Sequence, residues 1–131
     1  MIRTDFENQQ AWDTICKLIR APVHDGSDTF YAYVEILEDT EFRNLSKEEL
    51  LARAPKDYNH SFLLVVDSIA ITHPDFPILV IDLYADRGRN FRAIPSQIPC
   101  IESNLSIANM CFFEFADAVN KDGIFRGFPE P

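Results

Sequence analysis

The sequence predicts an α/β fold, with α+β as the alternative, built as a single mixed sheet of about five strands with helices packed on its faces. The first observation is the run 77–84, whose core at residues 78–81 is apolar at every position. Such a short run without alternation is typical of a strand buried on both faces. A second run, residues 62–67, has the same character. The third observation is that helical patterns alternate with these strands along the chain, so both faces of the sheet can be covered.

The chain starts with residues 2–6, a short extended segment that we expect to be an edge strand. Residues 8–20 predict a helix, because apolar residues recur three and four positions apart. Asp5 or Asn8 can cap this helix, and Pro22 ends it.

Residues 30–37 alternate between two kinds of side chain. Ala32, Val34 and Ile36 fall on one face, and Tyr31, Tyr33 and Glu35 on the other. This alternation predicts a strand with one face in the core and one partly in solvent. The pair Asp25-Gly26 predicts a turn before it.

A short second helix is expected after residue 46. Ser46 and Glu49 have the spacing of a capping box, in which each side chain satisfies the other's end of the first turn. Pro55 stops this helix. The acidic residues 38–43 before it can form one helical turn around Phe42.

The two apolar strands are joined by only about ten residues, and parallel neighbours normally need a dozen or more. Residues 68–72 can supply one helical turn, so the relative orientation of strands 62–67 and 78–84 stays open. Residues 85–90 predict a hairpin turn centred on Gly88. Residues 91–94 would then return antiparallel.

Near the C-terminus, Pro95 and Pro99 are expected to bracket a loop that leads into residues 101–109. Residues 110–119 carry an apolar stripe that predicts a helix. Residues 124–128 are too apolar for a free tail, and we expect them to dock as an edge strand or plug.

The chain of 131 residues predicts one globular domain spanning 1–131. Its net charge of −9 argues against nucleic acid and anionic membranes as partners and suits a basic protein partner. No apolar run is long enough for a membrane span and no signal peptide is evident. The three cysteines lack metal or redox spacing, so they indicate reduced thiols and a cytoplasmic protein.

No catalytic, cofactor or metal motif stands out. Asp67 and Asp82 follow buried strands, and paired carboxylates at strand ends can bind Mg²⁺. The favoured interpretation is structural: Asp67 caps a turn, and Asp82 pairs with Arg87 or Arg92. The histidines are scattered without ligand spacing.

Arg87, Arg89 and Arg92 form a basic cluster around the predicted hairpin. Paired guanidinium donors there can hold a carboxylate or a phosphate, which makes these residues candidate anion-binding residues. The alternative is that they neutralise nearby carboxylates such as Asp82, Asp86 and Glu102.

The C-terminal region carries three motifs: Asn-Leu-Ser-Ile-Ala-Asn-Met at 104–110, Glu-Phe-Ala-Asp-Ala-Val at 114–119 and Asp-Gly-Ile-Phe-Arg-Gly-Phe at 122–128. Together with residues 3–6 and Trp12, they resemble a family of small bacterial proteins of unknown function. The resemblance covers most of the chain. It implies a free-standing cytosolic bacterial protein and no assigned activity.

Two functions remain open. The leading hypothesis is a non-catalytic acidic binding protein, of an immunity or regulatory type, with Glu38, Asp39, Glu41, Asn104 and Asn109 as candidate partner-binding residues. The two asparagines favour a structural corner as well, because their side chains bond backbone groups at turns. The alternative is a small enzyme or ligand-binding domain that uses the arginine hairpin to hold an anionic small molecule. The sequence leaves the oligomeric state open.

Overall fold

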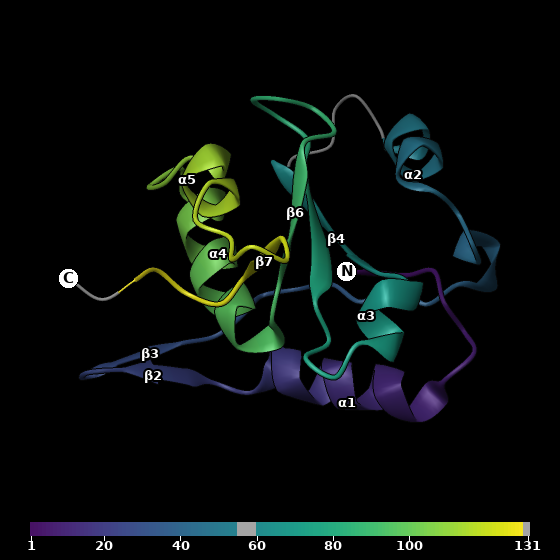
Figure 1. Ribbon diagram of the computed structural model, residues 1–131, viewed down its shortest axis with the longest axis horizontal. Coiled ribbons are helices and arrows are strands. Elements are labelled where there is room, and N and C mark those ends of the chain that lie inside the picture. The colour runs from purple at the N-terminus through teal and green to yellow at the C-terminus, as the bar shows by residue number, and fades with distance from the viewer. Residues whose placement is uncertain (55–59, 130–131) are drawn as a thin grey trace.

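A five-stranded mixed sheet forms the centre of the protein, in the order β1-β4-β5-β6-β7. The computed structural model describes residues 1–54 and 60–129 (Figure 1). The strands are β1 (Ile2–Arg3), β4 (Phe62–Val66), β5 (Ile78–Asp82), β6 (Asn90–Ala93) and β7 (Ile124–Phe125). β1 and β7 pair in parallel with β4 and β6, whereas β4, β5 and β6 are mutually antiparallel. The predicted mixed α/β sheet is therefore confirmed.

The orientation that the sequence left open is antiparallel, with Leu63 opposite Ile81. Only the short helix α3 (Ser68–Thr72) and a turn join β4 to β5, which is too little chain for a crossover. The hairpin between β5 and β6 is confirmed as well. Gly88 lies there at φ +97°, a backbone conformation that favours glycine.

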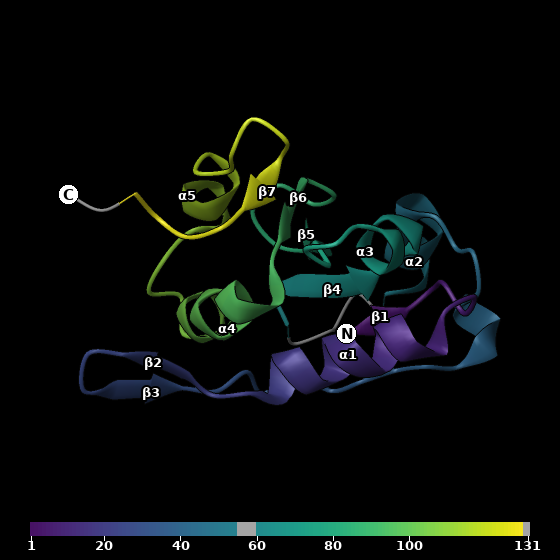
Figure 2. The same cartoon turned by 60° about the horizontal axis from the view of Figure 1, so that its bottom comes forward.

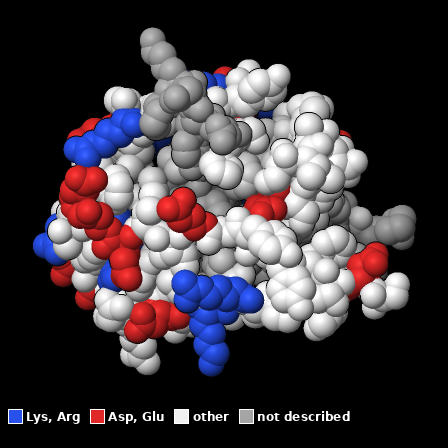
Figure 3. All heavy atoms as spheres, turned by 180° about the vertical axis from the view of Figure 1, so that it is seen from behind, with Lys and Arg blue, Asp and Glu red and all other residues white. Residues whose placement is uncertain are grey.

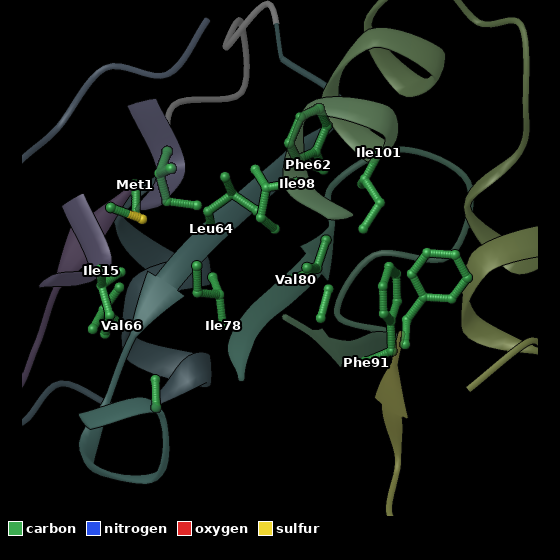
Figure 4. Packing of buried hydrophobic residues seen from close by; sticks show 14 of the residues in the cluster. Met1, Ile15, Phe62, Leu64, Val66, Ile78, Val80, Phe91, Ile98 and Ile101 are labelled. Atoms are coloured by element: carbon green, nitrogen blue, oxygen red, sulfur yellow. The ribbon is translucent and has the colours of Figure 1, made fainter. Parts of the chain in front are cut away.

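The larger hydrophobic cluster covers one face of the sheet. It joins alternate strand residues such as Leu64, Ile78 and Val80 to α1 (Gln9–Arg20), α4 (Ile98–Ser106) and α5 (Phe112–Ala116). Figure 4 shows these strand side chains with Ile98 and Ile101 of α4 nearby. Ile78, Val80 and Ile81 are fully buried, which confirms the central position predicted for this strand.

The opposite face is covered by α2 (Lys47–Arg53). Leu50 of this helix packs with Ile2, Leu63, Val65 and Ile81 in a second, smaller cluster. In Figure 1, α4 and α5 lie on one side of the strands and α2 on the other. Alternate residues of β4 thus serve two different cores, as expected for a strand without a solvent-facing side.

The local signals for the helices in the first half of the chain are confirmed. Asn8 caps α1 by accepting a hydrogen bond from the Ala11 backbone N–H. Ser46 and Glu49 form the capping box of α2. The expected helical turn around Phe42 is a 3₁₀ turn, Thr40–Phe42. Pro55, predicted to end α2, lies outside the described residues.

The prediction of a strand at residues 30–37 is wrong. Only Phe30 is in a strand, at the end of β3 (Asp28–Phe30), which forms a hairpin with β2 (Val23–Asp25) that extends away from the sheet (Figure 2). Residues 31–36 belong to no strand in the described part of the chain, and Leu37 makes one bridge to Ile2. Their burial still alternates, with 32, 34 and 36 partly buried, because the pattern depends on packing and not on a ladder.

The loop predicted from Pro95 and Pro99 is also wrong. Pro95 opens a 3₁₀ turn, Pro95–Gln97, and Pro99 lies in the first turn of α4. Proline is tolerated at both places because the first backbone N–H groups of a helix have no internal acceptor. The helix expected at 110–119 is shorter, α5, because Met110 still bonds back to the Asn104 carbonyl. The C-terminal segment docks as the edge strand β7, as expected.

Candidate functional site

The short strand β1 has a neighbour on each side. On one side Thr4 N–H donates to the Val66 carbonyl of β4 at 3.0 Å. On the other side Arg3 N–H donates to the Leu37 carbonyl, and Leu37 N–H to the Met1 carbonyl, both at 2.9 Å. The Met1 α-amino group donates to the Glu35 carbonyl at 2.5 Å. Residues 35–37 therefore run parallel to β1 as an extended flank of the sheet.

β1 is shorter than the segments on either side of it. Its register with β4 covers Val65 and Val66 alone, so residues 62–64 extend beyond it on one side and residues 33–35 on the other. A cavity of about 470 Å³ lies between these walls, ahead of Met1. We call this cavity the strand gap. Its volume is within the roughly 300–1,000 Å³ of typical ligand sites.

The strand gap is mostly apolar and passes between the two helical layers. Val34, Phe62 and Leu64 line it with residues of α4, and Leu50 and Phe42 line it from the side of α2. Among the described residues, its polar lining includes Tyr33, Glu35, Arg53, His60, Glu102 and Ser106. Tyr33 is 83% exposed, so its ring lies at the mouth of the cavity.

The backbone of β4 turns polar groups toward the strand gap. Leu83 N–H donates to the Ser61 carbonyl, so Ser61, and with it Leu63 and Val65, face β5. Residues 62 and 64 face the other way, as Val66 does when it accepts from Thr4. β1 does not reach residue 62, which leaves part of this edge without a strand partner among the described residues.

Glu102 is the buried titratable group of the site. It lies on α4 on the same stripe as Ile98, Ile101 and Leu105, and it is 8% exposed. Its Oε1 accepts the Tyr33 backbone N–H at 3.0 Å. Burial raises the pKa of this carboxyl, while the Tyr33 N–H and the nearby His60 act in the opposite direction.

A second buried group closes the inner end of the strand gap. Burial lowers the pKa of the Met1 α-amino group to about 6, and the nearby Glu35 partly opposes that shift. The site thus combines apolar walls, open backbone positions and a few buried polar groups, which can orient a bound molecule.

The three candidate arginines do not share a site. Arg87 donates to the Leu51 carbonyl at 2.8 Å, and Arg89 pairs with Asp117 at 2.6 Å. Arg92 makes a two-pronged contact with Asp67, at 2.9 and 2.6 Å. No contact among the described residues joins the three guanidinium groups, so anion binding stays a prediction.

Asp67 and Asp82 lie at opposite ends of the antiparallel pair β4–β5. Asp67 also caps α3 through Ala70 N–H. Asp82 accepts the backbone N–H groups of Tyr84 and Asp86 and so fixes the turn after β5. The expected cap by Asp67 is confirmed, but the expected pairing of Asp82 with Arg87 or Arg92 is wrong. Within residues 1–54 and 60–129, no three His, Cys, Asp or Glu side chains gather as metal ligands.

The candidate acidic residues Glu38, Asp39 and Glu41 are exposed. Glu38 accepts from the buried Arg3 at 3.4 Å, and Asp39 caps the 3₁₀ turn. This segment leaves the strand gap at Leu37 and returns to it at Phe42. In Figure 3, seen from behind, acidic side chains gather at the left, the side of α2, beside a largely uncharged area.

Asn104 and Asn109 contact each other at 2.8 Å through their side chains. Asn104 also donates to the Cys100 carbonyl within α4. Together they shape the corner that ends this helix, in agreement with the structural alternative. Both lie outside the lining of the strand gap.

The sequence interpretation missed Glu102 as a site residue. A signal was present: a carboxylate four residues after Ile98 and three before Leu105 falls on the apolar stripe of a helix. That signal has meaning only once residues 98–106 are recognised as helical. Pro95 and Pro99 predicted a loop there instead of a helix.

Comparison with known proteins places the chain in one family. It belongs to the family described as domain of unknown function (DUF6924), whose model matches residues 1–128. No curated protein and no solved structure matches the chain. No helix in the described part of the chain is long and apolar enough to cross a membrane.

Proposed function

We propose that this protein is a non-catalytic binding protein of the bacterial cytosol, of an immunity or regulatory type, that holds a basic and partly apolar segment of a partner protein in the strand gap. The strand gap itself carries this proposal. It combines apolar walls with open backbone positions beside β4.

The charge around the strand gap supports a basic partner. Residues 35–49 carry six acidic side chains against Arg43 and Lys47: Glu35, Glu38, Asp39, Glu41, Glu48 and Glu49. Glu35 and Glu102 line the cavity together with Arg53, and Leu37 and Phe42 of the acidic segment line it as well. Such a field attracts a basic partner at long range, and salt screens it over about 10 Å at 0.1 M.

Selection from a library of short random peptides displayed on phage, against the immobilised chain, tests this function. We expect enriched peptides that alternate basic and apolar residues. The triple variant Glu38→Gln, Asp39→Asn, Glu41→Gln should bind them more weakly at low salt, and the difference should disappear at high salt.

Two controls separate the site from general effects. The variant Glu7→Gln, Asp13→Asn, Asp28→Asn makes the same charge change at exposed positions elsewhere and should retain low-salt affinity. Ser106→Trp places an indole at the lining of the strand gap and should block binding, whereas Ile107→Trp, next to it but outside the lining, should not. Equal binding by all four variants would refute the proposal.

A further inference from the structure

We propose that the bound segment enters the strand gap as an extended strand in line with β1, and that it hydrogen-bonds to β4 on one side and to residues 33–35 on the other. This inference rests on the proposed function and names its mode of recognition.

The width of the strand gap fits one strand. β1 is paired on both sides, so β4 and residues 35–37 lie two strand spacings apart, each of about 4.8 Å. The same two walls continue past Met1 as residues 62–64 and 33–35, with the cavity between them. A chain in line with β1 therefore finds a partner on each side, as β1 does.

The backbone groups of both walls point into this space. Residue 62 on the β4 wall faces it, as argued above. On the other wall, the Leu37 N–H and carbonyl and the Glu35 carbonyl all bond toward β1. Tyr33, two residues before Glu35, presents its N–H to the same side, where it meets Glu102.

Glu102 therefore occupies the place of a strand carbonyl. A buried backbone N–H without an acceptor is costly, and Oε1 of Glu102 satisfies Tyr33 until a bound strand can do so. Displaced from Tyr33, the buried carboxylate needs a new partner. A Lys or Arg of the bound segment supplies it.

The two faces of the strand gap predict the pattern of the segment. Side chains of a strand alternate between faces. One face presents Glu102 and Ser106 of α4, and the other presents Phe42, Leu50 and Arg53 near α2. The bound strand should therefore place basic residues toward α4 and apolar residues toward α2 at alternate positions.

Amide hydrogen exchange measured by NMR on the full chain, with and without a selected peptide, tests the strand mode. We expect Leu63 and Val65, already bonded to β5, to exchange slowly in both states. Phe62 and Leu64 should become protected on binding. A peptide N-methylated at one central residue should bind about tenfold or more weakly, since it loses a buried backbone hydrogen bond, and the same change at a terminal residue should have little effect.

Glu102→Gln tests the side-chain part. It should weaken binding of the basic peptide but not of a peptide whose basic residues are replaced by norleucine. Equal losses for both peptides would contradict the assignment of Glu102 to a basic residue.

The outcomes distinguish the two proposals. Peptide binding that Ser106→Trp blocks, but that adds no protection at Phe62 and Leu64 and tolerates central N-methylation, would overturn the strand mode and leave the proposed function standing. Failure to select any peptide, or occupation of the strand gap by apolar small molecules alone, would overturn both.

Discussion

The contact between Asp67 and Arg92 gives a stability prediction that separates two roles of one side chain. Asp67 follows β4 and caps α3 through Ala70 N–H at 3.1 Å. The same carboxylate accepts two hydrogen bonds from Arg92 of β6, which also donates to the Pro77 carbonyl at 3.0 Å. Asp67→Asn keeps an oxygen for the cap and removes the charge that faces Arg92.

The expected loss follows from the burial of the pair. Breaking a fully buried ion pair costs about 3–5 kcal/mol. The Arg92 and Asp67 side chains are 17% and 25% exposed, so solvent reduces that cost. We expect Asp67→Asn to lower the free energy of unfolding by about 2 kcal/mol. Asp67→Ala should lose about 1 kcal/mol more, because it also removes the cap.

The free energies of unfolding can be measured by urea denaturation. The proteins to compare are the wild type, Asp67→Asn, Asp67→Ala, Arg92→Met and the double mutant Asp67→Asn with Arg92→Met. The double-mutant cycle should give a coupling energy of about 1–2 kcal/mol. A loss below about 0.5 kcal/mol for Asp67→Asn would refute the reasoning, since surface substitutions commonly fall in that range. It would also mean that Asp67 does not hold Arg92 firmly, so that Arg92 remains a candidate for anion binding.

Three further predictions concern the core, the buried carboxyl and the arginines. Val80→Asp should abolish soluble folded protein, because Val80 is fully buried and the carboxylate would have no partner; a circular dichroism melt within a few degrees of wild type would contradict the central position of β5. Burial raises the pKa of Glu102 in the folded protein above that of an ordinary glutamate. The protonated form therefore stabilises the fold at pH values below the ordinary pKa, and this contribution is lost as the pH rises through the raised pKa. Glu102→Gln should therefore melt above wild type near neutral pH and level with it in acid, and the opposite order in differential scanning calorimetry would show that the charged form is favoured. Arg89 is paired with Asp117, so sulfate should raise the melting temperature of wild type and Arg89→Ala equally; a larger rise in wild type would support the anion-binding hypothesis.

The sequence determined those features that depend on local patterns. The apolar run at 78–81 predicted β5 and its burial, because no periodicity left a face for solvent. The spacing of apolar residues predicted α1, and Ser46 with Glu49 predicted the start of α2. Each of these signals lies within a few turns of chain, where propensity and side-chain direction act without knowledge of neighbours.

Residues 30–37 show where local information ends. Their alternation correctly predicted which side chains face the core, but it could not show that their contact with β1 is limited to a single bridge, Ile2 with Leu37. Pairing is a property of two segments, and the register of β1 with β4 joins residues more than sixty positions apart. The sequence could not predict the partners of the three arginines for the same reason. Arg87 bonds to Leu51 of α2, Arg89 to Asp117 just after α5, and Arg92 to Asp67 at the end of β4.

The strand gap itself was decided only by the tertiary structure. Its walls come from residues 33–37, β4 and the helices α2 and α4, and no pattern within any one of them predicts a cavity between them. Glu102 becomes a site residue because the packing of α4 brings its carboxyl to the Tyr33 N–H, 69 positions away in the chain. The sequence supplies the apolar walls and the acidic border, whereas the cavity lies between residues 33–35 and β4, which only the tertiary structure brings to the two sides of β1.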